Sequence, residues 1–295
     1  MANKRQKTCL VTGCSSGGVS AAIAEAFANH GYHVFATART PSKIPQTLHT
    51  SPNVTVLTLD VTSTESIAAA VKSVQEKTGG MLDVLINNAG HSLNTPALDA
   101  SIEETKKLFN ANFFGVLETI QAFQHMLIRA KGCIVNNSSV GGYQPFPFIT
   151  LYQASKAALT IAGEGWRLEL APLGVRVITL VTGGVATKFL NNIQPVQLPK
   201  DSYYTSIKDV IDDHPDHVPF GMKPEIFASD VLRRVEKGST GKAWVGGAIP
   251  MIRMALWFFP QWALDRVSLM SKPPFTQRIA DEHAKRMVAD STKAI

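Results

Sequence analysis

The sequence has few cysteines and no long hydrophobic run, and both shortages narrow what the protein can be. Its three cysteines, Cys9, Cys14 and Cys133, form no CxxC pair and no Cys/His cluster with metal-ligand spacing. We therefore expect no disulfide framework, no structural metal, and a reduced, cytoplasmic protein. No apolar run follows the N-terminal MANKRQKT, so we expect no secretory signal.

The excess of charge is modest and has no single location. The 29 lysines and arginines and 23 aspartates and glutamates give a formal net charge of +6, spread along the chain. This predicts a mildly basic solvated surface with no nucleic-acid partner, and it is compatible with an anionic cofactor or a membrane surface. At 295 residues and 45% hydrophobic content, the chain is long enough for one large domain, 1–295.

Strand-like and helix-like segments alternate along the chain. We expect strands at Cys9–Val11, His33–Ala36, Val54–Leu59, Val84–Ile86, Ile134–Asn136, Val175–Leu180 and near Ala243–Val245, and helices at Ala21–Asn29, Ser66–Glu76, Glu103–Arg129 and Tyr152–Leu170. Because parallel strands need crossover connections, the alternation predicts an α/β fold: a doubly wound parallel sheet of about seven strands with helices on both faces. Ligands should collect at the carboxyl ends of the strands.

A glycine-rich stretch, TGCSSGGVS, connects the first expected strand to the first helix. Glycines at such a turn allow unusual backbone angles and close approach of a pyrophosphate, which the helix N-terminus attracts. The predicted cofactor-binding residues here are Gly13, Ser15, Ser16, Gly17, Gly18 and Val19. Ser20 stands where a strict fingerprint has its last glycine, and any tight strand-to-helix turn uses similar residues.

Arg39 follows the second expected strand in VFATART. An acidic residue at this place accepts the ribose hydroxyls of NAD(H), whereas an arginine pairs with the 2′-phosphate of NADP(H). The sequence therefore favours NADP(H), the alternative being a surface arginine that contacts no ligand.

Five motifs in a fixed order carry a family resemblance. They are TGCSSGGVS, LDV at Leu59–Val61, NNAG at Asn87–Gly90, ANFFG around Asn112, and NSSVGGYQPFPFITLYQASKAAL from Asn137 to Leu159. From Thr8 to about Gly247 the chain resembles the short-chain dehydrogenase/reductase family. The resemblance implies a single Rossmann-fold domain and an NADP(H)-dependent oxidoreductase acting on CH–OH and C=O groups.

Tyr152 and Lys156 are four residues apart, so they share one face of a helix. An ammonium beside a phenol lowers the pKa of the phenol, and we expect Tyr152 to exchange protons. The resemblance implies that Ser139 orients the substrate carbonyl, that Lys156 also holds the nicotinamide ribose, and that Asn112 supports a proton relay. Without the family pattern, the YxxxK spacing would indicate only an ordinary exposed helix face. The neighbouring Ser138 is expected to have no catalytic role.

Further cofactor contacts follow from the same resemblance. They fall on Asp60, Val61, Asn88, Ala89, Gly90, Gly183, Val185 and Thr187. Asp60 could instead cap a turn. Thr182 replaces the usual proline of the nicotinamide-side loop, which predicts a less rigid loop.

The glycine loop is similar to a longer family variant, TGxxxxGxG, found in the fungal subgroup related to 1-acyldihydroxyacetone-phosphate reductase. In that variant the final glycine permits close helix packing, so we expect the small Ser20 to leave the phosphate cradle intact. The similarity to this subgroup includes VFATAR and the apolar C-terminal segment.

Aromatic residues near the catalytic motif indicate the kind of substrate. The loop YQPFPFI lies between Ser139 and Tyr152, and with His91 we expect it to line an apolar pocket through Tyr143, Phe146 and Phe148. The alternative is that these rings pack the core. The expected substrate is an apolar carbonyl compound, either a lipid intermediate resembling acyl-dihydroxyacetone phosphate or a fungal polyketide.

The regions after the last catalytic motif are less regular. We divide the chain into a cofactor-binding and catalytic core at 7–190, a substrate loop or lid at 191–240, and a C-terminal apolar helical extension at 248–295. In the extension, the charge-free run Met254–Leu264 is too short to span a bilayer. Its aromatic residues are compatible with a peripheral membrane contact, a lid over the substrate, or packing against the protein's own core or a subunit partner. The expected location is cytoplasmic, and association with the endoplasmic reticulum or lipid droplets is a further expectation.

Three functions are compatible with these motifs. The first is an NADPH-dependent ketoreductase with Tyr152 as proton donor. The second is a catalytically silent NADP(H)-binding regulator on the same fold. The third uses the same site for oxidation, epimerisation or dehydration. In each case family resemblance implies a homodimer or homotetramer formed through the long helices Glu103–Arg129 and Tyr152–Leu170.

Overall fold

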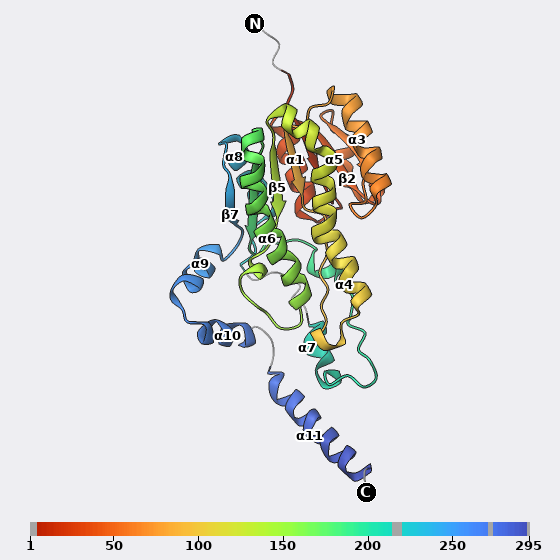
Figure 1. Ribbon diagram of the computed structural model, residues 1–295, viewed down its shortest axis with the longest axis vertical. Helices are drawn as coiled ribbons and strands as arrows, with labels where there is room; N and C mark the ends of the chain where they lie inside the picture. The colour runs from red at the N-terminus through yellow and green to blue at the C-terminus, as the bar shows by residue number, and fades with distance from the viewer. Residues whose placement is uncertain (1–4, 214–219, 271–273, 294–295) are drawn as a thin grey trace.

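One parallel β-sheet organises the protein. The computed structural model describes residues 5–213, 220–270 and 274–293. Its seven strands lie in the order β3-β2-β1-β4-β5-β6-β7 (Figure 1). The strands are β1 Thr8–Val11, β2 His33–Ala38, β3 Val54–Thr58, β4 Val84–Asn87, β5 Cys133–Asn137, β6 Arg176–Thr182 and β7 Gly241–Val245. The predicted doubly wound α/β fold is confirmed.

Helices cover both faces of the sheet and bury two separate apolar layers. They are α1 Val19–Asn29, α2 Gln46–His49, α3 Thr64–Thr78, α4 Ile102–Phe109, α5 Gly115–Ala130, α6 Thr150–Leu170, α7 Lys208–Asp212, α8 Pro224–Glu236, α9 Ile249–Phe258, α10 Gln261–Met270 and α11 Thr276–Lys293. Phe27 of α1 and Phe227 of α8 belong to one layer. Phe123 of α5 and Leu159 of α6 belong to the other. The inner strands β1, β2, β4, β5 and β6 are buried on both sides, which explains their largely continuous apolar character.

The side of β1 on which successive strands are added to the sheet changes after β3. From β1 the chain moves outward to β2 and β3, and then it crosses back to β4 and continues to β7. All neighbouring strands are parallel. In such a sheet, the crevice for a ligand lies outside the carboxyl ends of the strands, where the order reverses. That crevice lies between the ends of β1 and β4.

The expectation of one continuous helix over Glu103–Arg129 is wrong. The structure divides it into α4, a π-helical turn at Asn110–Phe114, and α5. Gly115 is the first residue after the wide turn, and a Cβ atom there would lie 2.4 Å from the Val61 carbonyl oxygen. The close approach of α5 to the chain after β3 therefore requires a glycine, and the widened turn holds Asn112 in the interior.

The C-terminal part extends the molecule beyond the α/β domain. After β7, helices α9 and α10 form a bent pair beside the domain, and α11 reaches away from it (Figure 1). The first part of the predicted substrate loop or lid, residues 191–219, contains α7 and single 3₁₀ turns, and its residues 214–219 lie outside the described part. A third apolar cluster links this segment to Phe148 and to Phe275, which precedes α11. In the described ranges, no helix combines the length and apolar character needed to cross a membrane.

Two glycines of α6 provide a matched test of this packing. A Cβ atom at Gly163 would lie 2.2 Å from Thr179 Oγ1 in β6, whereas at Gly165 it would meet only Glu169 Oε1 at 3.9 Å. We expect Gly163→Ala to lower the free energy of unfolding by about 1–3 kcal/mol through overpacking. We expect Gly165→Ala to raise it by about 0.5–1 kcal/mol because alanine favours the helix. Urea unfolding followed by circular dichroism measures both, and equal effects would contradict the close contact between α6 and β6.

Candidate active site

The predicted site residues converge at the carboxyl ends of the central strands. The glycine loop follows β1, Asn88 to Gly90 follow β4, Ser139 follows β5, and Gly183 follows β6. Tyr152 and Lys156 lie on α6, which packs against β6 and the 3₁₀ turn after Ser139. The crevice of the fold therefore coincides with the motifs found in the sequence.

The glycine loop has the backbone that a phosphate cradle needs. Gly13 and Gly17 both have a φ of +78°, a backbone conformation that residues other than glycine rarely adopt. A Cβ atom at Gly13 would also lie 3.0 Å from Ala89 Cα. Gly18 precedes α1, and no side chain caps the first amides of that helix. A pyrophosphate fits this place because those amides remain available to an anion.

Ser20 does more than replace a small glycine. Its side chain is completely buried, and its Oγ donates to the Thr12 carbonyl oxygen at 2.8 Å and accepts a hydrogen bond from Asn88 Nδ2. The expectation that serine is tolerated there only because it is small is therefore incomplete. The hydroxyl fixes the start of α1 to the ends of β1 and β4.

This hydrogen bond is the first in a series that crosses the strand ends. Asn137 Nδ2 donates to Asn88 Oδ1, and Thr182 Oγ1 donates to Asn137 Oδ1. Ser20, Asn88, Asn137 and Thr182, which we call the strand-end network, thus link the ends of β1, β4, β5 and β6. Thr182 lacks the ring of a proline, but its hydroxyl holds the start of the next loop in place.

The catalytic candidates are packed around the end of β5. Lys156 Nζ donates to the Asn137 carbonyl oxygen at 2.8 Å and lies 5.9 Å from the centre of the Tyr152 ring. Ser139 Oγ accepts a hydrogen bond from the Gly141 amide at 3.0 Å, which fixes the 3₁₀ turn at Val140–Gly142. The bystander role expected of Ser138 agrees with its contacts, because its buried hydroxyl donates to the Lys156 carbonyl oxygen at 2.8 Å.

Burial, rather than the lysine charge, controls the acidity of Tyr152. Its pKa is raised because burial disfavours the phenolate, and a hydrogen bond with Ser139 opposes this only partly. The expected lowering of the Tyr152 pKa by Lys156 is therefore wrong for this structure. Burial also lowers the pKa of Lys156 from 10.5 to about 8. A protonated phenol is suited to donating a proton, and it lies here beside an ammonium group whose own pKa is lowered.

Asn112 is held on both sides of its amide. Its Oδ1 accepts from the His91 amide at 3.0 Å, and its Nδ2 donates to the His91 carbonyl oxygen and to Ser155 Oγ, both at 3.0 Å. A Cβ atom at Gly90 would lie 2.6 Å from Asn112 Oδ1. The π-helical turn thus joins the segment after β4 to α6, three residues beyond Tyr152.

The residues predicted for the adenosine side lie after β2 and β3. Arg39 is exposed directly after β2. Burial lowers the pKa of His91, and the positive charge of the Arg39 guanidinium lowers it further. The charge of Arg39 therefore acts on a residue that directly follows the NNAG motif. Asp60 does cap a turn, because its Oδ1 accepts from the Thr62 amide at 2.9 Å. Val61 is buried beside it.

The loop after β6 approaches the glycine loop directly. The Lys188 amide donates to the Gly17 carbonyl oxygen at 3.0 Å. Val185 is buried and bridges to Met222, and the Thr187 amide donates to its carbonyl oxygen at 2.9 Å. No sequence motif indicated Lys188, whose Cδ would lie 2.7 Å from a Cβ atom at Gly17.

The aromatic residues predicted to line the pocket separate into different environments. Tyr143 packs on Trp244 of β7, with ring centres 4.9 Å apart, and Phe148 packs on Phe275 at 5.0 Å. Phe146 is half-buried, and its amide donates to Gln153 Oε1 at 3.1 Å. The ring that faces Tyr152 is instead Phe189, at 6.1 Å. Phe189 has no motif of its own, and only its place after Thr187 could have indicated it.

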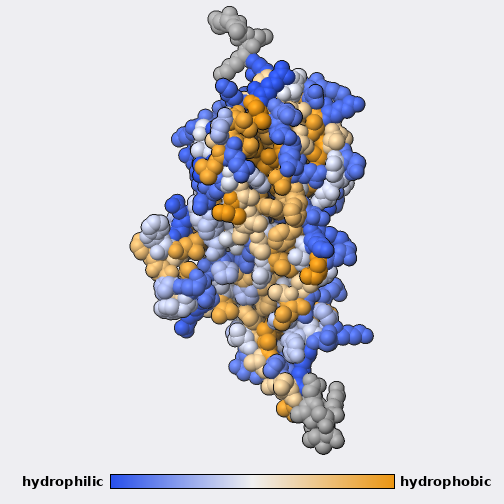
Figure 2. Space-filling view, viewed as in Figure 1, coloured by the Kyte–Doolittle hydropathy of each residue, from blue (hydrophilic) through white to orange (hydrophobic). Residues whose placement is uncertain are grey.

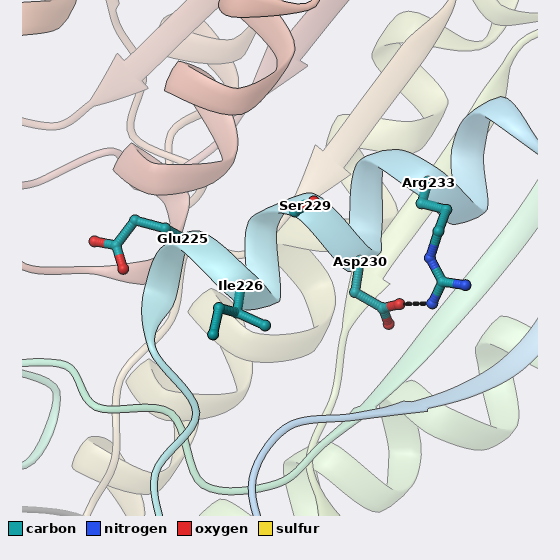
Figure 3. A pocket seen from close by; sticks show the side chains of 5 residues that line it. All are labelled: Glu225, Ile226, Ser229, Asp230 and Arg233. Atoms are coloured by element: carbon teal, nitrogen blue, oxygen red, sulfur yellow. Dashed lines mark hydrogen bonds and ion pairs between the residues drawn. The ribbon is translucent and has the colours of Figure 1, made fainter.

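A shallow depression on α8 is separate from this site (Figure 3). Its lining side chains all come from one helix, on the face opposite the buried Phe227 and Val231. Asp230 there is neutralised by ion pairs with Arg233 and Arg234. The depression is therefore an open patch on the outer face of one helix and shares no residue with the site at the strand ends.

Comparison with known proteins gives the chain its relatives. It is 46% identical over 210 residues to the short-chain dehydrogenase cctT of Talaromyces islandicus, an alignment covering 70% of this chain and 74% of that protein. It is 42% identical over 210 residues to the NADPH-dependent 1-acyldihydroxyacetone phosphate reductase of Schizosaccharomyces pombe, covering 70% of each.

Solved structures and a family model agree with these relatives. A short-chain dehydrogenase from Burkholderia cenocepacia J2315 in complex with NADP superposes with a TM-score of 0.69 at 26% identity, covering 89% of this chain and 97% of that one. The family model described as short chain dehydrogenase matches residues 7–197. The chain therefore belongs to the short-chain dehydrogenase/reductase family of NAD(P)-dependent oxidoreductases, which act on alcohol and carbonyl groups.

Proposed function

We propose that the protein is an NADPH-dependent ketoreductase that reduces the carbonyl group of an apolar substrate. The observation that carries this proposal is the arrangement of the half-buried Tyr152 beside Ser139 and Lys156, with Lys156 Nζ 5.9 Å from the centre of the Tyr152 ring; desolvation raises the pKa of the phenol and so favours its protonated form. A protonated phenol is the form required to donate a proton to a carbonyl oxygen.

Bound NADPH would supply the hydride for the carbonyl carbon. Tyr152 breaks its O–H bond and gives the proton to the carbonyl oxygen, so that the carbonyl becomes an alcohol. Ser139 donates a hydrogen bond to the same oxygen and fixes its direction toward the phenol. The Lys156 ammonium stabilises the phenolate left behind, and it is oriented by the Asn137 carbonyl oxygen. Asn112 supports proton return through water near Ser155.

The preference for NADPH over NADH rests on Arg39. It is exposed after β2, and it is the cation at the place where an acidic residue would accept ribose hydroxyls. The Schizosaccharomyces pombe relative is NADPH-dependent by name, and the Burkholderia cenocepacia structure holds NADP. The cradle at Gly13 and Gly17, with the neighbouring Lys188 loop, fits the phosphates of either cofactor.

The proposed substrate is bulky and apolar. Phe189 faces Tyr152, and Phe148 lies in an apolar cluster with Val196, Ile207 and Phe275. These rings favour a lipid-like or polyketide-like carbonyl compound over a small polar one. A silent NADP(H)-binding regulator is the alternative, but it gives no reason for the intact arrangement of Tyr152 with Lys156.

We also propose that two copies pair through α4, α5 and α6. Two large apolar side chains on α6, Ile161 and Leu168, are 74% and 64% exposed. Apolar residues on one helix are typical of subunit contacts. The state of assembly is measured by analytical ultracentrifugation.

The first prediction concerns the proton donor. We expect Tyr152→Phe to lower the rate of NADPH-dependent reduction of phenanthrenequinone or of a long-chain methyl ketone by about 10²–10⁴-fold. Binding of NADPH, measured by its fluorescence, should stay close to that of the unchanged protein. Tyr32→Phe is the matched control, because that hydroxyl pairs with Glu236 away from the strand ends. Full activity in Tyr152→Phe would support the silent regulator or another reaction.

The second prediction concerns Arg39. We expect Arg39→Asp to weaken NADPH binding by roughly tenfold or more, because the 2′-phosphate then faces a carboxylate. The same variant should bind NADH at least as well as before. Lys72→Asp on α3 makes the same change of charge at an exposed position and should leave both affinities unchanged. Equal losses for the two cofactors would contradict the phosphate contact.

The third prediction concerns pH. Lys156 is protonated below its pKa of about 8 and loses its charge above it. We expect the affinity for NADPH to be nearly constant at lower pH and to fall as the pH rises through about 8, since the neutral amine holds the ribose less firmly. Lys156→Met should bind more weakly and without this step. An unchanged step in Lys156→Met would assign the titration to another group.

A further inference from the structure

The bent pair of helices α9 and α10 carries exposed aromatic side chains that the reductase site does not use. We call residues 249–270 the elbow. Trp257, Phe258 and Trp262 are 83%, 72% and 71% exposed, and they lie on either side of the bend at Pro260. Figure 1 shows the elbow beside the α/β domain, and Figure 2 shows apolar and weakly polar residues at its surface. Such an aromatic group in water is costly unless it meets a partner.

The inner side of the elbow is anchored to the loop between Ser139 and Tyr152. Leu264 and Ser268 of α10 are buried, and Gln144 Nε2 donates to Ser268 Oγ at 2.6 Å and to the Leu264 carbonyl oxygen at 3.3 Å. Gln153, next to Tyr152, donates in turn to the Gln144 carbonyl oxygen at 2.7 Å. The anchored face of α10 thus lies against the loop between Ser139 and Tyr152, while Trp257, Phe258 and Trp262 remain exposed to solvent.

The chemistry of the elbow favours a lipid surface with negative charge. Tryptophan and phenylalanine beside arginine are typical of segments that lie in the membrane interface. Arg253 and Arg266 are both exposed, and the one carboxylate of the elbow, Asp265, accepts a hydrogen bond from Gln261 at 2.7 Å. The elbow therefore combines apolar rings with a net positive charge.

The shape of the elbow favours a membrane over a second copy of the chain. Helix α9 has ten residues, roughly 15 Å in length, and Pro260 separates it from α10. Neither half could cross a hydrocarbon core of about 30 Å, but both can lie flat in its interface. The exposed rings lie around a projecting bend, whereas pairing of two copies requires a broad matching face.

We propose that the elbow docks the protein on an anionic phospholipid membrane by inserting Trp257, Phe258 and Trp262 into the interface. Arg253 and Arg266 then contact lipid phosphates or carboxylates. The loop between Ser139 and Tyr152, which α10 contacts, then lies close to the source of membrane-dissolved substrates. This last consequence rests on the proposed reductase function, but the docking itself does not.

Flotation with vesicles tests the docking without substrate or cofactor. The probe is a phosphatidylcholine vesicle containing roughly one third phosphatidylserine, compared with pure phosphatidylcholine. We expect the unchanged protein to float with the anionic vesicles, and its tryptophan fluorescence to be quenched by brominated acyl chains. Binding should weaken at high salt, because the arginine contacts are screened.

Variants distinguish membrane binding through the elbow from non-specific hydrophobic binding. The triple variant Trp257→Ser, Phe258→Ser, Trp262→Ser should partition at least about tenfold more weakly. The control, Ile226→Ser with Leu173→Ser, removes exposed apolar side chains elsewhere and should bind as the unchanged protein does. Circular dichroism and NADPH fluorescence confirm that each variant is folded, and loss of reductase activity in any of them does not affect the flotation result.

Two outcomes would overturn the proposal. One is equal flotation of the unchanged protein and the triple variant. The other is a combination of two results: the unchanged protein does not float, and ultracentrifugation shows a dimer that is lost only in the triple variant. That combination would assign the elbow to contact with a second copy of the chain. Flotation of the unchanged protein that the triple variant loses supports the membrane contact whether or not the protein reduces ketones.

Discussion

The strand-end network of Ser20, Asn88, Asn137 and Thr182 is the constraint on which the arrangement of the site depends. Its hydrogen bonds connect the ends of four adjacent strands, so that the loops leaving those strands start from fixed positions. Ser20 is fully buried and the other three members are partly buried, and a buried polar group without a partner costs about 1–3 kcal/mol. Removing one member therefore leaves its direct neighbours short of a hydrogen bond, whereas the complete network connects all four loops.

Asn137 has a double role in this arrangement. Its side chain continues the network from Asn88 to Thr182, and its main-chain oxygen accepts the hydrogen bond from Lys156 Nζ. The position of the lysine is thus determined by the same residue that aligns the glycine loop with the loop after β6. The geometry of cofactor binding and that of proton transfer share one support, and a displacement at either end of the network is transmitted to the other.

The sequence predicted the sheet and the site motifs because both leave local signals. Buried parallel strands are continuous apolar runs, and Tyr152 with Lys156 follows helical spacing. Other features depend on contacts between distant residues. The π-helical turn at Asn112 arises from the approach of Gly115 to Val61, and the hydroxyl bonds of Ser20 involve Asn88. Neither is visible in a single segment.

The acidity of Tyr152 shows why motif spacing is insufficient for chemistry. Spacing places an ammonium near the phenol and predicts a lowered pKa, but the pKa is raised because the ring is enclosed by the segments around it. The surroundings of the predicted pocket residues likewise depend on distant parts of the chain. Tyr143 and Phe148 lie in one short loop, yet the first packs on β7 and the second on Phe275, far along the chain.

These partners lie largely outside the segment that is common to the family. The family model ends at residue 197, whereas Ser268 binds Gln144, Phe275 packs on Phe148, and Trp244 packs on Tyr143. Residues 7–197 therefore contain all four predicted catalytic residues, Ser139, Tyr152, Lys156 and Asn112. The chain beyond them packs against the loop between Ser139 and Tyr152 and so positions the side chains of that loop.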